Sequence, residues 1–242
     1  MIYLSPAADY EEGKPIRGGI PVCWPWFGPH PEDPTQPAHG FARLLAWELL
    51  ECEDEGGCVA IRLGLRPSAA TRAFWPHDFE AFLEIRVGAE LNVALVTHNS
   101  GDAPRPEGGA LHTYLQVGDI KQVSLLGLDG ATYRDATAKG MRHVQEGPLR
   151  IDREIDRLYE PREDVTVIDP ALGRKLVIHK QGANTTVVWN PWIEKSTRLA
   201  DLPDEDYHRF VCVEATNPND KAAQVAPRGT HVLRTRIEVL PL

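Results

Sequence analysis

Short runs of alternating apolar and polar residues restrict the fold of this chain more than any other feature. In one of them, Val59, Ile61, Leu63 and Leu65 fall on the same side of an extended backbone. The runs 83–87 and 91–95 are separated by Gly-Ala-Glu and predict a β-hairpin. Further short runs occupy 122–128, 176–179, 185–189, 210–215 and 231–239. Because no stretch sustains a helical apolar stripe over three turns, we predict an all-β sandwich or barrel.

Length and charge narrow the class of protein further. The 242 residues suit a single domain, 1–242, without an internal repeat or a low-complexity linker. A net charge of −9 argues against nucleic-acid binding, which needs a basic surface. The sequence has no apolar run long enough to span a bilayer and begins without a secretory leader, so we expect a cytoplasmic protein with no membrane partner.

The four cysteines, Cys23, Cys52, Cys58 and Cys212, lack the spacing of a zinc site. We expect reduced and mostly buried thiols, as is usual in a reducing compartment. The alternative is a disulfide between Cys52 and Cys58, which would require an oxidising compartment.

The segment 14–28 is dense in aromatic residues, proline and glycine. Two glycines follow Arg17 and would allow the backbone to approach a ligand closely. Trp24 and Trp26 offer flat apolar faces that suit a sugar ring. The alternative is a strand that carries two structural tryptophans into the core. A proline-rich loop, 28–38, follows and precedes the sequence His39-Gly40-Phe41-Ala42-Arg43, where Arg43 could bind phosphate or vicinal hydroxyls.

Two titratable residues stand inside apolar runs. His112 lies in Ala-Leu-His-Thr-Tyr-Leu, where a histidine is more often a hydrogen-bonded core residue than a catalytic one. Glu214 lies in Phe-Val-Cys-Val-Glu-Ala, and a carboxylate in such a strand is costly unless it is paired or used in function. Glu214 is therefore the stronger functional candidate on physical grounds.

Seven segments between residues 14 and 217 together resemble one family, the hexose-6-phosphate mutarotases (glucose-6-phosphate 1-epimerases) of the galactose mutarotase-like superfamily. The segments are IRGGIPVCWPWFG, HGFAR, WPHDF, ALHTYLQVGDI, IDRLY, VVWNPW and FVCVEATN. The resemblance implies a large antiparallel β-sandwich with an open sugar groove. It also implies exchange of the α and β anomers of a sugar phosphate, without a cofactor or a catalytic metal.

Carried over position by position, the resemblance places the family's catalytic pair at His112 and Glu214. Glu214 would be the base that takes a proton from the C1 hydroxyl, and His112 the acid that protonates the ring oxygen. Asp156 is a candidate for the charge that keeps His112 protonated.

The substrate-contacting residues of the family fall on Arg17, Arg43 and Asp156. His39 and Trp24 are added here as candidate substrate contacts from the segments that contain them. The family often has Gln before HGFAR, where this chain has Ala38, so one sugar contact is missing or replaced. The family also carries strands before the segment that matches residues 1–6, which predicts an exposed sheet edge and self-association.

Three other functions compete with this interpretation. A non-catalytic carbohydrate-binding module would use the same groove without turnover. Glycoside hydrolysis ordinarily needs two carboxylates at the scissile bond, and only Glu214 stands in a convincing position. A cupin-like metal site would use His39, His112 and His179, which lack a recognisable ligand spacing.

Overall fold

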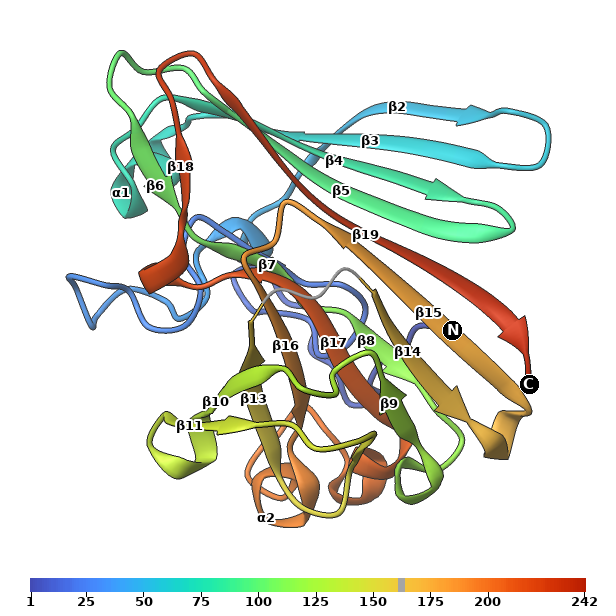
Figure 1. The fold of residues 1–242 in the computed structure, drawn as a ribbon. Helices are drawn as coiled ribbons and strands as arrows, with labels where there is room; N and C mark the ends of the chain where they lie inside the picture. The colour runs from blue at the N-terminus through green and yellow to red at the C-terminus, as the bar shows by residue number, and fades with distance from the viewer. Residues whose placement is uncertain (161–163) are drawn as a thin grey trace.

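The alternating runs of the sequence form the strands of two large antiparallel sheets. The computed structural model describes residues 1–160 and 164–242 (Figure 1). Within these residues one sheet has nine strands, ordered β12-β9-β14-β15-β19-β5-β4-β3-β2. Their bounds are Leu149–Arg150, Ser124–Leu126, Asp164–Asp169, Arg174–Gln181, Thr230–Pro241, Glu90–Asn99, Phe79–Val87, Val59–Leu65 and Glu48–Asp54. The predicted hairpin is confirmed as β4 and β5, which pair from Phe79 and Asn99 to Val87 and Leu91.

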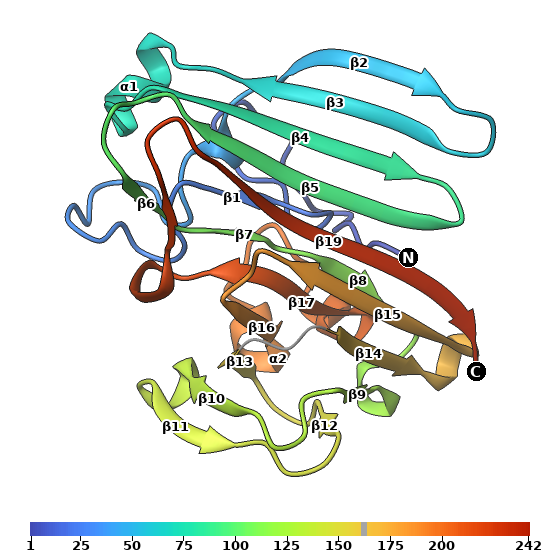
Figure 2. The same ribbon diagram turned by 45° about the horizontal axis from the view of Figure 1, so that its top comes forward.

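The second sheet has eight strands among the described residues, in the order β1-β7-β17-β16-β13-β10-β11, with β8 also paired to β17. Their bounds are Val22–Cys23, Gly109–Leu111, Phe210–Asn217, Thr185–Asn190, Ile155–Tyr159, Thr132–Asp135, Met141–Val144 and, for β8, Tyr114–Gln116. A separate two-stranded ribbon joins β6 (Arg105–Glu107) to β18 (Ala223–Val225). Figure 2 shows β5, β19 and β15 side by side, with β7 and β17 on the other sheet.

Helices are short and lie between strands. The two α-helices of the described chain are α1 (Ala69–Phe74) and α2 (Trp192–Ser196). Short 3₁₀ helices cover Ala42–Leu44, Ile120–Gln122, Ala136–Ala138, Pro170–Leu172, Asp204–Arg209 and Asn219–Lys221. None of the helices placed in the structure is long and apolar enough to cross a membrane.

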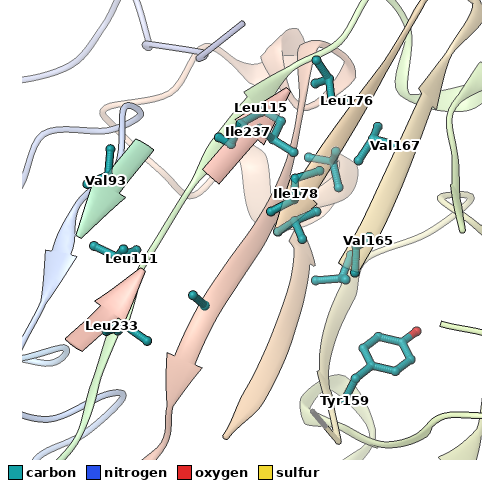
Figure 3. Packing of buried hydrophobic residues seen from close by; sticks show 14 of the residues in the cluster. Val93, Leu111, Leu115, Tyr159, Val165, Val167, Leu176, Ile178, Leu233 and Ile237 are labelled. Atoms are coloured by element: carbon teal, nitrogen blue, oxygen red, sulfur yellow. The ribbon is translucent and has the colours of Figure 1, made fainter. Parts of the chain in front are cut away.

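The core lies between the two sheets, which confirms the predicted sandwich. It takes inward-facing residues from both, because side chains alternate between the two faces of each strand. Figure 3 shows members of this cluster from both sheets: Val93, Leu111, Leu115, Leu233 and Ile237. The opposite face of the eight-stranded sheet carries a smaller apolar cluster that includes Tyr114, Trp189 and Phe210. That second face is the one that carries the candidate site.

The four cysteines are free, but only two of them are buried as expected. Cys23 and Cys212 are buried, whereas Cys52 is exposed and Cys58 is half-buried. Cys52 lies on β2 opposite Ile61, while Cys58 lies in the turn before β3.

Candidate active site

A pocket of about 270 Å³ opens on the outer face of the eight-stranded sheet and gathers most of the predicted site residues. Strand β17 explains how a carboxylate comes to line it. Val211, Val213 and Ala215 point into the sandwich core, so Glu214, between two of them, points to the opposite face. The side chain of Glu214 is only 1% exposed.

Neighbouring strands bring further side chains to the same face. Asp156 on β13 is opposite Trp189 on β16, and Trp189 is opposite Cys212 on β17. Cys212 is in turn opposite Tyr114 on β8. This row crosses four adjacent strands, and three of its members, Asp156, Trp189 and Tyr114, line the pocket.

His112 lies in the two-residue break between β7 and β8. Its backbone N–H donates to the Pro21 carbonyl (3.1 Å), which ties it to the segment just before β1. The imidazole is parallel to the Tyr114 ring, with centroids 4.9 Å apart and planes 14° apart. Its Nε2 lies 3.4 Å from Glu214 Oε1. The structure therefore brings the two predicted catalytic residues together.

Each member of this pair keeps one buried polar atom for which the described residues supply no hydrogen-bond partner. These atoms are His112 Nδ1 and Glu214 Oε2. Buried polar atoms are nearly always satisfied in folded proteins, and an orphan atom at a pocket wall is a position where a ligand hydroxyl can bind.

Burial controls the protonation of the pair. It raises the pKa of Glu214 well above its ordinary value, and the nearby Asp156 carboxylate raises it further while Arg43 opposes this. Burial, followed by the charges of His39, Arg43 and Arg17, lowers the pKa of His112 well below its ordinary value. Both shifts favour the uncharged forms, a protonated Glu214 and a neutral His112, over the ion pair.

The expected role of Asp156 is therefore corrected. Asp156 lines the pocket, but its charge acts on the pKa of Glu214 rather than keeping His112 protonated. Burial raises the pKa of Asp156 itself, and the ammonium of Lys195, 3.8 Å away, opposes that shift.

Three cationic side chains line the pocket: Arg17, Arg43 and Lys195. Arg17 Nε donates to Asp201 Oδ1 (3.1 Å) and its Nη1 donates to the Tyr114 hydroxyl (3.0 Å). Arg43 Nη2 donates to the Ala38 carbonyl (3.0 Å). A local group of cations in a protein of net charge −9 is suited to a single small anion.

His39 reaches the pocket from a strained loop. Its φ is +66°, and the next residue, Gly40, has φ +72° and passes so close to Trp24 that an added Cβ would lie 2.0 Å from the Trp24 carbonyl oxygen. Burial and the charges of Arg43 and Arg17 lower the pKa of His39 to about 4. Its Nδ1 accepts from the Gly28 N–H (3.3 Å), so the neutral ring carries its proton on Nε2.

Trp24 is not at the pocket, contrary to the expectation of a substrate contact. Its side chain is 2% exposed and packs edge-on against Trp75 and Phe79, and its Nε1 donates to Glu107 Oε2 (3.1 Å). Trp24 is therefore a structural core residue, which was the alternative to a sugar contact. The aromatic wall of the pocket is formed instead by Trp189 and Phe27.

Sequence reasoning missed Lys195 and Asp201 and gave Tyr114 no role. Lys195 lies on α2, where its Nζ is 2.9 Å from Glu154 and 3.8 Å from Asp156. Neither Lys195 nor Asp201 has a local sequence signal, because both depend on how α2 and the following loop fold over the sheet. Tyr114 could have been found from the sequence, because it follows His112 by two residues in the same apolar run.

The histidine set of a cupin-like metal site is not assembled. His179 is on β15 of the nine-stranded sheet, where it contacts Asp164 and Glu238. Residues 1–160 and 164–242 contain no group of three His, Cys, Asp or Glu side chains arranged to hold a metal ion.

Comparison with known proteins adds independent information. The family model described as aldose 1-epimerase matches residues 9–238. A protein of Escherichia coli strain K12, provisionally named glucose-6-phosphate 1-epimerase, is 36% identical over 97% of this chain and 79% of its own length. A Salmonella typhimurium protein with the same provisional name is 36% identical over 94% of this chain and 77% of its own length. The solved structure of YeaD from Salmonella typhimurium, provisionally named a mutarotase, superposes with a TM-score of 0.94 at 32% identity, covering 100% of this chain and 80% of that chain.

Proposed function

Because the chain belongs to the aldose 1-epimerase family, we propose that it interconverts the α and β anomers of a hexose 6-phosphate. The names of its curated relatives support this substrate class. The observation that carries the proposal is one arrangement in one pocket: a buried His112–Glu214 pair, 3.4 Å apart, beside three cationic side chains.

The reaction needs two proton transfers. A base removes the proton of the C1 hydroxyl, the electrons of that O1–H bond form the C1=O1 double bond of the aldehyde, the C1–O5 bond breaks with its electrons going to O5, and an acid protonates O5. Rotation about C1–C2 and the reverse transfers close the ring on the other face of C1. No electron is gained or lost by the sugar, so the chain needs only one proton acceptor and one proton donor in reach of the ring.

We assign the two transfers to Glu214 and His112. In the state with the proton on His112, Glu214 is the base and His112 the acid; with the proton on Glu214, these roles are exchanged. Because ring closure returns a proton to O1 and removes one from O5, the opposite of ring opening, a pair with one proton serves both steps. We assign Asp156 and His39, which line the same pocket, to the ring hydroxyls.

We assign the phosphate to the cationic side of the pocket. Arg17 and Arg43 present guanidinium groups, which bind phosphate oxygens through charge-assisted hydrogen bonds. Arg17 already pairs with Asp201, whereas Arg43 donates to the uncharged Ala38 carbonyl, so a phosphate would add a charged partner that a neutral hexose lacks. This predicts a preference for the phosphorylated sugar.

Catalytic efficiency on glucose 6-phosphate and on free glucose tests the proposal. We expect the phosphorylated sugar to be preferred, and Arg17→Gln to lower that efficiency by about tenfold or more while the efficiency on glucose changes little. Arg153→Gln, at a largely exposed residue, is the matched control. Equal efficiencies on both sugars in the wild type would contradict the assignment of the phosphate.

We also propose that the protein self-associates at the edge strand β2 when its charges are screened. Among the described strands, β2 pairs only with β3. Its seven residues include Glu48, Glu51, Glu53 and Asp54, so pairing with a second copy would place like charges together. Sedimentation should show more dimer at high salt than at low salt, and a strict monomer in both would contradict the proposal.

A further inference from the structure

Tyr114 is the one residue of the pocket that contacts both a substrate-binding candidate and a catalytic candidate through separate parts of its side chain. Its hydroxyl accepts a hydrogen bond from Arg17 Nη1 (3.0 Å). Its ring stacks on the imidazole of His112 (4.9 Å, 14°). The side chain is 2% exposed, so it has little freedom to take another position.

The hydroxyl of Tyr114 is one of two fixed points for the Arg17 guanidinium. The other is Asp201, whose Oδ1 accepts from Nε at 3.1 Å. Two bonds to different nitrogens define both the position and the plane of the group. An arginine held in this way can meet a phosphate without first losing the freedom of a long side chain.

The ring of Tyr114 fixes the other partner. The parallel contact covers one face of the His112 imidazole, and Trp189 packs edge-on against both rings, at 5.8 Å from His112 and 6.0 Å from Tyr114. These contacts restrict rotation of the imidazole, and with it the direction in which Nε2 points toward Glu214.

We propose that Tyr114 is a positioning residue with two separate roles: it holds the Arg17 guanidinium for the sugar phosphate and the His112 imidazole for proton transfer. The hydroxyl positions the guanidinium and the ring positions the imidazole. This inference rests on the proposed function, because it takes Arg17 as a substrate contact and His112 as a proton-transfer group.

Two substitutions separate the parts of the side chain. Tyr114→Phe removes the hydroxyl and keeps the stacked ring, whereas Tyr114→Leu removes both. Tyr159→Phe is the matched control, since the hydroxyl of this buried tyrosine donates to Gln145 (2.8 Å) and the residue does not line the pocket. Thermal unfolding of each variant shows whether it is folded.

The Phe variant should bind glucose 6-phosphate about tenfold more weakly, the effect of losing one hydrogen bond to a charged group, and its affinity for glucose should change much less. The Leu variant should also lose about tenfold in kcat, which the Phe variant restores. Calorimetric binding and exchange kinetics measure these quantities. Equal loss of kcat in both variants, or unchanged binding of glucose 6-phosphate by the Phe variant, would overturn the assignment of separate roles to the ring and the hydroxyl.

Two measurements do not depend on turnover: the affinity for glucose 6-phosphate and the NMR titration of the His112 ring. They test the role of Tyr114 independently of the proposed function. If the wild type exchanged no anomers, the proposed function would fail, yet the affinity of Tyr114→Phe for glucose 6-phosphate would still decide the role of the hydroxyl. A pKa of His112 that moves in Tyr114→Leu and not in Tyr114→Phe would support the role of the ring. An unchanged His112 pKa in both variants would refute that role.

Discussion

His112 Nε2 lies 3.4 Å from Glu214 Oε1, and the two side chains come from different segments of the same sheet. Burial raises the pKa of the Glu214 carboxyl and lowers the pKa of the His112 imidazole, so both shifts favour the uncharged forms with one proton on the pair. One proton on two groups is what a reversible ring opening requires, because one oxygen of the sugar must give a proton while another receives one.

The pH profile of kcat/KM should be bell-shaped, with the acid side set by His112 and the alkaline side by Glu214. Below the lowered pKa of His112 both groups are protonated and no base remains, so the rate falls toward low pH. Above the raised pKa of Glu214 no acid remains, so the rate falls toward high pH. The apparent values belong to the coupled pair. In Glu214→Gln the alkaline limb should disappear from the residual activity; loss of the acid limb instead would contradict this order.

Replacing Glu214 should stabilise the folded protein. A carboxyl whose pKa is raised on folding binds more protons in the folded than in the unfolded state, so stability falls as pH rises from its ordinary value toward the raised one. Glu214→Gln removes this loss and should raise Tm by about 2–4 °C at neutral pH. The gain should be larger at pH 8 than at pH 5 in calorimetric scans. Glu194→Gln, at a largely exposed side chain, is the control, and a pH-independent difference would count against a buried ionisable Glu214.

Protonation of His39 should destabilise the folded protein at low pH, whereas ionisation of Glu214 destabilises it at high pH. Its pKa is about 4 in the folded protein against 6.5 as the ordinary value, so the unfolded chain binds more protons between these limits. Stability should therefore fall as pH drops from about 6.5 to about 4. His39→Asn tolerates the positive φ and can accept from Gly28, so its Tm should fall less over this range than the wild-type Tm. Parallel Tm curves would show that His39 does not titrate in this way.

Many of the strands, and Glu214 among the site residues, could be predicted from the sequence because their signals are local. Alternation identified β3 and the β4–β5 hairpin, and the buried carboxylate at position 214 stood out within its own strand. The convergence of Arg17, Arg43, His112 and Glu214 was predicted only by resemblance to a family, since these residues are far apart along the chain.

What the sequence could not supply depends on packing between distant segments. Trp24 precedes a proline and Trp189 precedes an asparagine, and nothing else in these segments distinguishes their roles. In the structure Trp24 packs in the core, whereas Trp189 forms part of the pocket wall. Asp156 was correctly placed at the site, but its effect on pKa depends on which buried group its carboxylate approaches. That distance is a property of the folded sheet.

Exchange of magnetisation between the α and β anomers of glucose 6-phosphate, followed by NMR, tests the central claim most directly. It should be measured with EDTA present for the wild type, Glu214→Gln and His112→Asn. Each substitution removes one proton-transfer group at nearly constant shape. Thermal unfolding and binding of glucose 6-phosphate serve as controls for folding and for the pocket.

The account predicts fast exchange with the wild type despite EDTA. Each variant should be slower by about 10²–10⁴, the usual contribution of one positioned acid or base, while still binding the sugar phosphate. Variants that exchange at nearly the wild-type rate, or a wild type that binds glucose 6-phosphate without exchanging its anomers, would contradict the account and indicate a carbohydrate-binding module instead.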